Sequence, residues 1–358
     1  MKNLGRVLLL MLLTCCCCCA AEKTPEFYQA PKQITVTFTG DCTLGCDPRE
    51  RGKETGFDHY IEEYGIEYPF ALVKEIFASD DLTVLNLEGT FYDYDANRAP
   101  KTYTFRGAVD YARMLPLASV EVVSLGNNHT MDYGKAGFVS TVAALEANGV
   151  DWFGTTECSN RSWIYEKDGI RLGFVSINIS YWWQRGNGLK MKQLLADLKD
   201  AGCTVIVGCM HGGVEYADFH DSTQEKLADA LLKNGADIVI GNHPHVIQGM
   251  RVQDGKTTLW SLGNFSFGGN SQVRSLPALI AQVTFSFDDA NRYLGHQIRL
   301  LPVNISGDAE RNDYQPRLIT GREAEKAILT LQADSSPRKT VALYKEGEGA
   351  LQPFVPAP

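Results

Sequence analysis

The chain has 358 residues, of which 44% are hydrophobic and 22% charged, and it carries a net charge of −9. This composition is typical of an acidic globular protein and argues against nucleic acid as a partner, since binding a phosphate backbone calls for a basic face. Outside an N-terminal run of five cysteines, the remaining five are irregularly spaced, which excludes a regular disulfide framework.

Residues 1–21 have the pattern of an export signal. Two basic residues precede the apolar run Val7–Leu13, which is too short for a comfortable membrane span. The cysteine that follows resembles the lipobox of bacterial lipoproteins, although Thr14 stands where a smaller residue is usual. We therefore expect an exported lipoprotein of the cell membrane, or of the extracellular face of the envelope, with residues 22–31 as a polar tether. A secreted protein with an unusual leader is the alternative.

From Ile34 onward, apolar strand patterns alternate with helical patterns, as in a layered α/β domain. Strands are expected at 34–39, 82–87, 120–125, 150–153, 205–209 and 238–240, with a hairpin at 162–166 and 171–177. Helices are expected at 70–77, 109–117, 135–148, 190–199 and 222–234. Further antiparallel strands are expected at 250–252, 257–261, 279–287 and 296–303, before a last helix at 321–332.

This order of elements predicts a mixed fold with one main domain over residues 32–305. Residues 306–358 are expected to form a C-terminal extension. Its tail, from Ser335, contains several prolines and is expected to be loosely ordered.

Five of the predicted strands end in polar or ionisable side chains. These are Asp41, Asn86 with Glu88, Asn127 with Asn128 and His129, His211, and His243 with His245. Each group lies near a glycine, which lets the backbone turn sharply and approach a bound ion. Strand ends converge on one edge of such a sheet, so we expect these side chains to lie together. Carboxylates, amide oxygens and neutral imidazoles suit manganese, zinc or iron better than calcium.

The two histidines of the segment Gly241–Val246 lie directly after a short buried strand. Pro244 separates them, fixes one backbone φ and favours an extended conformation at His243. Taken alone, this motif is as well explained by one solvated and one internally hydrogen-bonded histidine. The donors at the other strand ends favour a metal site.

The ordered motifs resemble the CapA family, which is associated with poly-γ-glutamate capsule synthesis and belongs to the calcineurin-like metallophosphoesterase superfamily. They are Gly40-Asp41, Asn86-Leu87-Glu88, the run from Ser124 to His129 with Asp132-Tyr133-Gly134, the run from His211 to Tyr216, the run from Gly241 to Val246, and the run from Ser261 to Phe265. The resemblance implies a four-layer αββα sandwich with mixed sheets and a site for one or two divalent metal ions at the strand ends.

The resemblance also implies a ligand set: Asp41, Glu88, Asn128, His211, His243 and His245. Asp41 and His245 would hold the first ion, and Glu88 would bridge it to the second. The superfamily's first motif is Asp-x-His, whereas here Thr43 stands two residues after Asp41. We therefore expect one firm and one weaker metal position.

His129 is the candidate catalytic residue, because the resemblance places it near the leaving group. A bound divalent ion lowers the pKa of its water to about 7, so hydroxide becomes available at neutral pH. His129, next to a ligating Asn128, could give a proton to the departing group, a role worth roughly 10²–10⁴-fold in rate. The alternative is a histidine that only hydrogen-bonds a ligand.

Three further residues are candidates for substrate binding: Arg106, Trp182 and Trp183. Arg106 could hold a carboxylate or phosphate in a bidentate grip, although a surface arginine is the more frequent outcome. The adjacent tryptophans could line a cleft or pack on the protein's own surface.

The favoured function is a metal-dependent hydrolase or transferase that acts on an anionic cell-surface polymer. A non-catalytic envelope protein that binds the polymer is one alternative, and a metal-dependent phosphoesterase acting on a small phosphoester is the other. His129 favours catalysis, whereas the missing imidazole at Thr43 favours binding.

Overall fold

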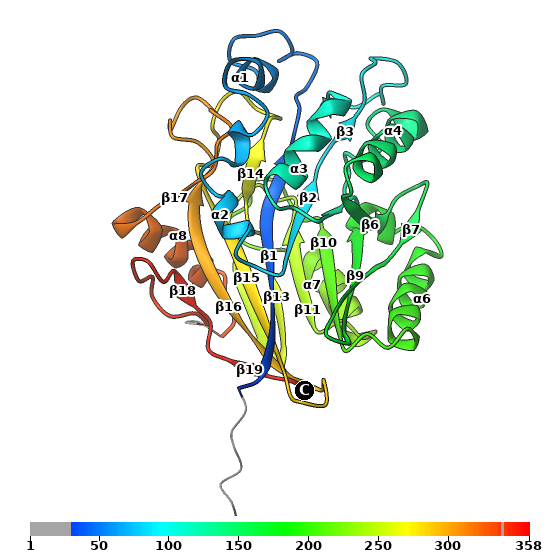
Figure 1. Cartoon of the computed structure of the whole chain (residues 1–358), viewed down its shortest axis with the longest axis vertical. Helices are drawn as coiled ribbons and strands as arrows, with labels where there is room; N and C mark the ends of the chain where they lie inside the picture. Colours follow the sequence, from blue (N-terminus) through cyan, green and yellow to red (C-terminus); the bar gives the residue numbers. More distant parts are fainter. Residues whose placement is uncertain (1–29, 338–339) are drawn as a thin grey trace, which may run out of the picture. The chain divides into compact units, whose positions relative to one another are not determined.

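Two β-sheets form the centre of the computed structural model, which describes residues 30–337 and 340–358 (Figure 1). The expected leader, and all but the end of the expected tether, lie outside the described residues. The smaller sheet contains β8 (Trp163–Lys167), β9 (Ile170–Asn178), β10 (Val205–His211), β11 (Ile238–Asn242), β12 (Met250–Gln253) and β13 (Lys256–Leu259). Its strand order is β12-β13-β11-β10-β9-β8.

The larger sheet is built around β1 (Lys32–Thr43). It also contains β2 (Leu82–Leu87), β5 (Val122–Ser124), β6 (Asp151–Thr155), β15 (Pro277–Phe287) and β16 (Tyr293–Asn304). Its remaining strands are β7 (Asn160–Arg161), β14 (Asn264–Phe267), β17 (Arg317–Leu318), β18 (Ala350–Leu351) and β19 (Val355–Pro356). The order is β17-β16-β15-β1-β2-β5-β6-β7, with β14 paired to β1 and with β18 and β19 paired to β16. A separate pair joins β3 (Thr90–Phe91) to β4 (Arg106–Gly107).

The main core lies between the two sheets. Side chains from both sheets, such as Val36 and Phe38 of β1 and Val207 and Ile240 of the smaller sheet, belong to one buried cluster. Alternate residues along a strand point to opposite faces, so the remaining apolar side chains of each sheet face outward. Helices cover those outward faces and complete the burial.

Helices on both outer faces make the fold a four-layer αββα sandwich, as the sequence predicted. The larger sheet is covered by α1 (Phe57–Tyr64), α2 (Lys74–Phe77), α3 (Met114–Leu117) and α4 (Gly134–Ala147). The smaller sheet is covered by α6 (Asn187–Asp200) and α7 (Ser222–Lys233). In α7, Leu227 and Leu231 lie one turn apart on the buried face, and a capping box at Asp221 begins the helix. Helix α8 (Gly321–Ala333) packs against β15 and β16.

Two predicted helices are shorter than expected. The segment 70–77 forms a 3-10 turn, Tyr68–Phe70, and then the single-turn helix α2. The segment 109–117 begins as a 3-10 helix, Val109–Arg113, and becomes α-helical only in α3. Helix α1 and the strand β14 were not predicted. The α1 segment is too short to show a sustained helical pattern of apolar residues, and the β14 segment does not alternate apolar and polar residues. Packing therefore decides their conformation.

The C-terminal tail differs from the expectation of loose order. Residues Ala350–Leu351 and Val355–Pro356 pair with β16, and Gln352 is buried. Residues 31–358 form one compact unit, which includes the predicted C-terminal extension. Backbone pairing with an existing strand needs no particular side-chain pattern. The pairing of this proline-rich tail could therefore not be predicted from its composition.

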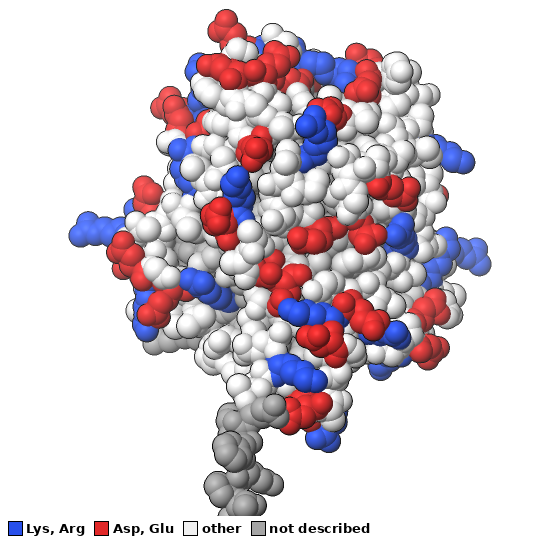
Figure 2. All heavy atoms as spheres, viewed as in Figure 1, with Lys and Arg blue, Asp and Glu red and all other residues white. Residues whose placement is uncertain are grey.

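The surface carries both signs of charge. On the face shown in Figure 2, acidic and basic side chains are interspersed. Within residues 30–337 and 340–358, no helix combines the length and the apolar character needed to cross a bilayer.

Candidate metal centre

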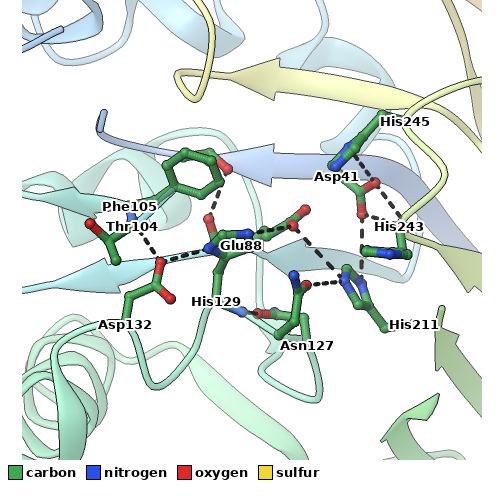
Figure 3. A network of polar contacts seen from close by, with 12 residues as sticks. Asp41, Glu88, Thr104, Phe105, Asn127, His129, Asp132, His211, His243 and His245 are labelled. Carbon is green, nitrogen blue, oxygen red and sulfur yellow. Dashed lines mark hydrogen bonds and ion pairs between the residues drawn. The ribbon is translucent and has the colours of Figure 1, made fainter. Parts of the chain in front are cut away.

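Parallel pairing brings the predicted donors to one edge of the sandwich. In the larger sheet β1 runs parallel to β2, and Asp41 lies opposite Asn86. In the smaller sheet β10 runs parallel to β11, and His211 lies opposite Asn242. A buried hydrogen bond of 3.4 Å from Asn242 Nδ2 to the Thr39 carbonyl joins the sheets at this edge. The carboxyl ends of both sheets therefore meet at one place (Figure 3).

Asp41 is fully buried, and both of its carboxylate oxygens accept hydrogen bonds. Asn86 Nδ2 donates to its Oδ1 at 2.8 Å, and the His243 backbone N–H donates to its Oδ2 at 3.0 Å. His245 Nδ1 lies 3.1 Å from the same Oδ2. Burial opposes ionisation, but the hydrogen bond and positive charge of His245, whose own pKa is raised to about 9 beside Glu88 and Asp41, outweigh it and lower the pKa of Asp41 to about 2. A metal ion bound to His245 would replace that proton. Asp41 is therefore a carboxylate at neutral pH.

Glu88 is buried like Asp41, but it differs in its hydrogen bonds. Neither carboxylate oxygen of Glu88 has a hydrogen-bond partner among the described residues. Oε1 lies 3.7 Å from His129 Nε2 and 3.9 Å from His211 Nε2, which is too far for hydrogen bonds. Burial and the negative charge of Asp41 raise the pKa of Glu88 well above its usual value. A buried carboxylate without donors is costly, and a cation between these side chains would remove that cost.

His211 and His243 offer nitrogen donors on the other side of Glu88. Their ring centroids are 4.8 Å apart, and His211 Nε2 lies 2.6 Å from Asn128 Oδ1. Burial, followed by the charge of the neighbouring histidine, lowers the pKa of His211 well below its usual value and that of His243 to about 4. Both imidazoles are therefore neutral near pH 7, which is the form that binds metal ions.

The loop that carries His243 and His245 has a strained backbone. His243 has φ of 102° and His245 has φ of 60°, a region that residues other than glycine rarely adopt. The prediction of an extended His243 was therefore wrong. The hydrogen bond from the His243 N–H to buried Asp41 holds the backbone in place against the preference imposed by Pro244. This backbone conformation places both imidazoles at the end of β11.

Glycines near the strand ends have a different role from the one expected. A Cβ at Gly40 would lie 2.1 Å from the Gly263 carbonyl oxygen, and one at Gly241 would lie 2.1 Å from that of Trp260. These two glycines therefore make room for the backbone between Trp260 and Asn264, not for an ion. That segment in turn places Asn264, whose Oδ1 lies 2.8 Å from His245 Nδ1.

The donors fit one or two metal ions. In the groups Glu88–His211–His243 and Asp41–Glu88–His245, the ligand atoms all lie within 4.8 Å of one another. Protein ligands sit about 2.0–2.2 Å from a zinc-type ion, so two ligands of one ion are at most about 4.4 Å apart. Only a small adjustment would therefore bring each group onto an ion. Glu88 belongs to both groups, as a bridging carboxylate would. Glu215, an exposed residue, forms a third group with His243 and His245.

His129 lies on the far side of Glu88 and is held by Asp132, a partner that the sequence analysis did not assign (Figure 3). Nδ1 of His129 lies 2.6 Å from Asp132 Oδ2, and Lys101 Nζ lies 2.6 Å from Asp132 Oδ1. The Phe105 ring stacks on the imidazole at 4.2 Å. Asp132 follows His129 by three residues in the sequence, and this spacing is the only signal there that the two side chains are partners.

The chain matches one family along most of its folded length. The family described as Bacterial capsule synthesis protein PGA_cap matches residues 35–269. The chain belongs to this family. The match confirms the resemblance found in the sequence motifs, which lie within those residues.

Two curated relatives are similar to the chain. The capsule biosynthesis protein CapA of Bacillus anthracis is 27% identical over 263 residues, which cover 68% of this chain and 62% of that protein. The PGA biosynthesis protein CapA of Bacillus subtilis (strain 168) is 27% identical over 257 residues, which cover 65% of this chain and 63% of that protein. Each match therefore spans just under two thirds of the relative. A solved 5'-nucleotidase from Candida albicans SC5314 matches with a TM-score of 0.41 and 11% identity, covering 78% of this chain and 53% of that one.

Thr43 stands two residues after Asp41, where the motif expected from the resemblance has a histidine. Its hydroxyl donates to the Glu88 carbonyl at 2.8 Å, so it positions the backbone of Glu88. Cys46 Sγ lies 3.4 Å from Asp58 Oδ2, and burial raises the pKa of this thiol to about 12. Neither residue belongs to a ligand group among the described residues.

Within the described part of the chain, Arg106, Trp182 and Trp183 make no hydrogen bond, ion pair or aromatic contact with the ligand groups. Arg106 donates to the Asp95 carboxylate and to the Tyr92 carbonyl. Trp182 ends α5 (Ile179–Trp182) and packs partly on the core beneath α6, whereas the Trp183 side chain is 56% exposed. The structure therefore brings together the predicted ligands and His129, but not these three residues.

Proposed function

We propose that this PGA_cap protein is a metal-dependent hydrolase or transferase that acts on an anionic polymer of the cell surface, such as a γ-linked glutamate chain. Membership of a capsule synthesis family supports the polymer. The observation that carries the chemistry is Glu88, a buried carboxylate that has no hydrogen-bond partner among the described residues and belongs to two groups of metal-type donors. A manganese, zinc or iron ion fits this donor set.

A bound divalent ion would polarise the attacked carbonyl and make a hydroxide available at neutral pH. Asp41 and Glu88 supply negative charge to hold such an ion, and His211, His243 and Asn128 supply neutral donors. His245 and the His243 N–H keep the Asp41 carboxylate in one orientation. The chain thus contributes a rigid, water-poor pocket in which ligand positions are set before the ion arrives.

His129 would transfer a proton to the leaving group. Its Nδ1 faces the Asp132 carboxylate, which only accepts hydrogen bonds, so Nδ1 carries a proton and Nε2 points toward Glu88. Asp132 also stabilises the imidazolium that donates from Nε2. Asp132 is therefore a positioning residue, and stacking by Phe105 restricts rotation of the ring.

A binding function without catalysis is the second candidate. It is favoured by Thr43, which stands where the resemblance would place an imidazole ligand. The Thr43 hydroxyl donates to the Glu88 carbonyl instead. In that case the ion would serve structure and the polymer would be retained but not cleaved. A phosphoesterase, the remaining alternative, uses the same donors on a different substrate.

The test combines elemental analysis with an assay for cleavage. Purified protein loaded with manganese is incubated with a γ-linked glutamate oligomer and, separately, with a general phosphoester. We expect at least one bound ion and shortening of the oligomer. Oligomer binding without cleavage, equal with and without His129, would replace the catalytic function with the binding one. Cleavage of the phosphoester alone would favour the phosphoesterase.

We also propose that the protein is exported and tethered by a lipidated cysteine in the run at residues 15–19. Cells grown with a fatty-acid analogue should label the wild-type chain. Cys15→Ala alone can be silent, since neighbouring cysteines could be lipidated instead, so the decisive variant replaces all five. An unlabelled wild-type chain would contradict the proposal.

A further inference from the structure

A polar cavity of about 530 Å³ opens beside the candidate metal centre. Three basic residues line it: Arg49, Lys53 and Arg274. Two acidic residues, Asp47 and Glu50, complete its charged lining. None of these five residues belongs to a metal-ligand group among the described residues, so the cavity is separate from the ion site itself.

The cavity and the metal centre share an aromatic wall. Gly269 lines the cavity, and its backbone lies so close to this wall that a Cβ there would be 2.5 Å from the Phe267 ring and 2.9 Å from the Phe105 ring. On the other side, the Phe267 ring centroid is 5.0 Å from that of His245, and the Phe105 ring stacks on His129. A ligand in the cavity is therefore one aromatic side chain away from the metal-binding and proton-donating groups.

Arg274 is the basic residue best placed to meet a ligand. Its guanidinium carbon lies 4.5 Å from the centroid of the Tyr216 ring, and that ring is 5.8 Å from the His245 ring. Asn270 Nδ2 donates to the Tyr216 hydroxyl at 3.4 Å, which fixes the tyrosine beneath the guanidinium. Stacking on an aromatic ring positions a guanidinium while leaving most of its five N–H donors available to a ligand.

The other charges of the cavity are already paired. Arg49 lies 2.7 Å from the Asp47 carboxylate, and Lys53 lies 3.0 Å from the Glu50 carboxylate. Arg274, in contrast, makes no ion pair with any residue in 30–337 or 340–358. The cavity therefore carries one uncompensated positive charge, and it sits on the side of the metal centre.

We propose that this cavity is a carboxylate subsite in which Arg274 holds a free carboxylate of the polymer next to the residue whose bond lies at the metal centre. The inference rests on the proposed function and names how the polymer is recognised. A γ-linked glutamate chain keeps one free carboxylate per residue, and a guanidinium binds such a group through two parallel hydrogen bonds. Arg274 lies beyond residues 35–269, so it is a feature of this chain that the family match does not cover.

The experiment compares Arg274→Gln with Arg322→Gln in the purified full-length protein loaded with manganese. Arg322 is an equally exposed arginine on α8 and does not line this cavity. Calorimetric titration with a γ-linked glutamate oligomer should show roughly tenfold weaker binding for Arg274→Gln, the loss expected for a charge-assisted hydrogen bond. Arg322→Gln should bind like the wild type. An oligomer whose carboxylates are converted to amides should bind wild type and Arg274→Gln equally.

Two controls keep the outcomes separate. Arg274→Lys keeps the charge but not the paired donors, and it should restore only part of the affinity. Metal content and melting temperature should be unchanged in all three variants. Equal oligomer binding by wild type and Arg274→Gln would overturn the subsite while leaving the polymer function intact. If wild type does not bind the oligomer but binds inorganic phosphate through Arg274, both the carboxylate assignment and the polymer function are wrong.

Discussion

Two buried histidine sites lie in this sandwich, and their polar atoms differ in how they are used. His296, on β16, is fully buried, and both ring nitrogens have neutral partners: Thr257 Oγ1 at 2.8 Å and the Tyr293 hydroxyl at 2.6 Å. At the metal edge, three histidines surround two carboxylates, and Glu88 has no hydrogen-bond partner among the described residues. The first arrangement is complete by itself, whereas the second needs a cation.

The difference teaches that burial of a histidine says little about its role. His296 hydrogen-bonds a hydroxyl of β13 in the smaller sheet and so links the two sheets. The metal site is marked by carboxylate oxygens that accept no hydrogen bond among the described residues, together with excess negative charge. The predictions below test this contrast, beginning with the largest expected effect.

Glu88→Gln should abolish most metal binding. The substitution keeps the shape of the side chain but removes the charge that both ligand groups share, and we expect at least a tenfold loss of metal affinity, since changes even to outer partners cost about 10–100-fold. Without metal, the variant should be more stable than the wild type, because burial and Asp41 both oppose ionisation of Glu88. Elemental analysis and chemical denaturation measure the two effects. His296→Gln, the matched control, should keep full metal content.

His129→Ala should lower turnover by about 10²-fold or more while leaving the metal in place, because a proton donor acts on the leaving group and not on the ion. Asp132→Asn should lower kcat less and should also change its pH profile, as expected for a positioning residue. Steady-state kinetics with the oligomer and elemental analysis provide the measurements. Loss of metal together with activity in His129→Ala would mean that this histidine is a ligand.

His296 should make the protein less stable in mild acid. Burial lowers its pKa to about 4 from 6.5. The unfolded chain therefore binds a proton in the window between these values and the folded chain does not, so stability is complete above pH 6.5 and falls as pH decreases toward 4. Between pH 7.5 and 5 the loss should be about 2 kcal/mol. Denaturation curves of wild type and His296→Gln should differ in this slope, and parallel curves would refute the assignment.

Thr43→Val should have the smallest effect. It removes the hydrogen bond to the Glu88 carbonyl, which is worth about 1 kcal/mol. Metal content should change far less than in His211→Ala or His243→Ala, because only those two remove nitrogen donors. Thermal unfolding and elemental analysis of the three variants measure the order. Full metal content in the double variant His211→Ala, His243→Ala would show that the ligands are misassigned.

Much of the fold could be predicted from the sequence because its signals are local. Helices α7 and α8 have clear apolar periods, the buried strands are short apolar runs, and the donors lie at or just after the ends of those strands. Parallel topology then implies that those donors meet. The CapA resemblance supplied the four layers, which periodicity alone does not specify.

The rest depends on contacts between distant segments. Phe105 stacks on His129 and Arg274 stacks on Tyr216. The sequence near Phe105 or Tyr216 does not predict either contact. The φ of His243 is set by a hydrogen bond to Asp41, about two hundred residues earlier in the chain. Sequence patterns report local preference, and these features are cases in which tertiary contacts override it.

The short strands on β16 have a consequence for the solubility of the protein. β16 is twelve residues long, and beyond β15 its other side is covered only at intervals, by β17, β18 and β19. An uncovered strand of this length presents free backbone donors and acceptors that can pair with another molecule. By pairing with β16, the strands β18 and β19 therefore reduce the backbone available for self-association. A protein shortened before Ala350 would keep its metal edge but expose β16, and it would be prone to aggregate through that strand.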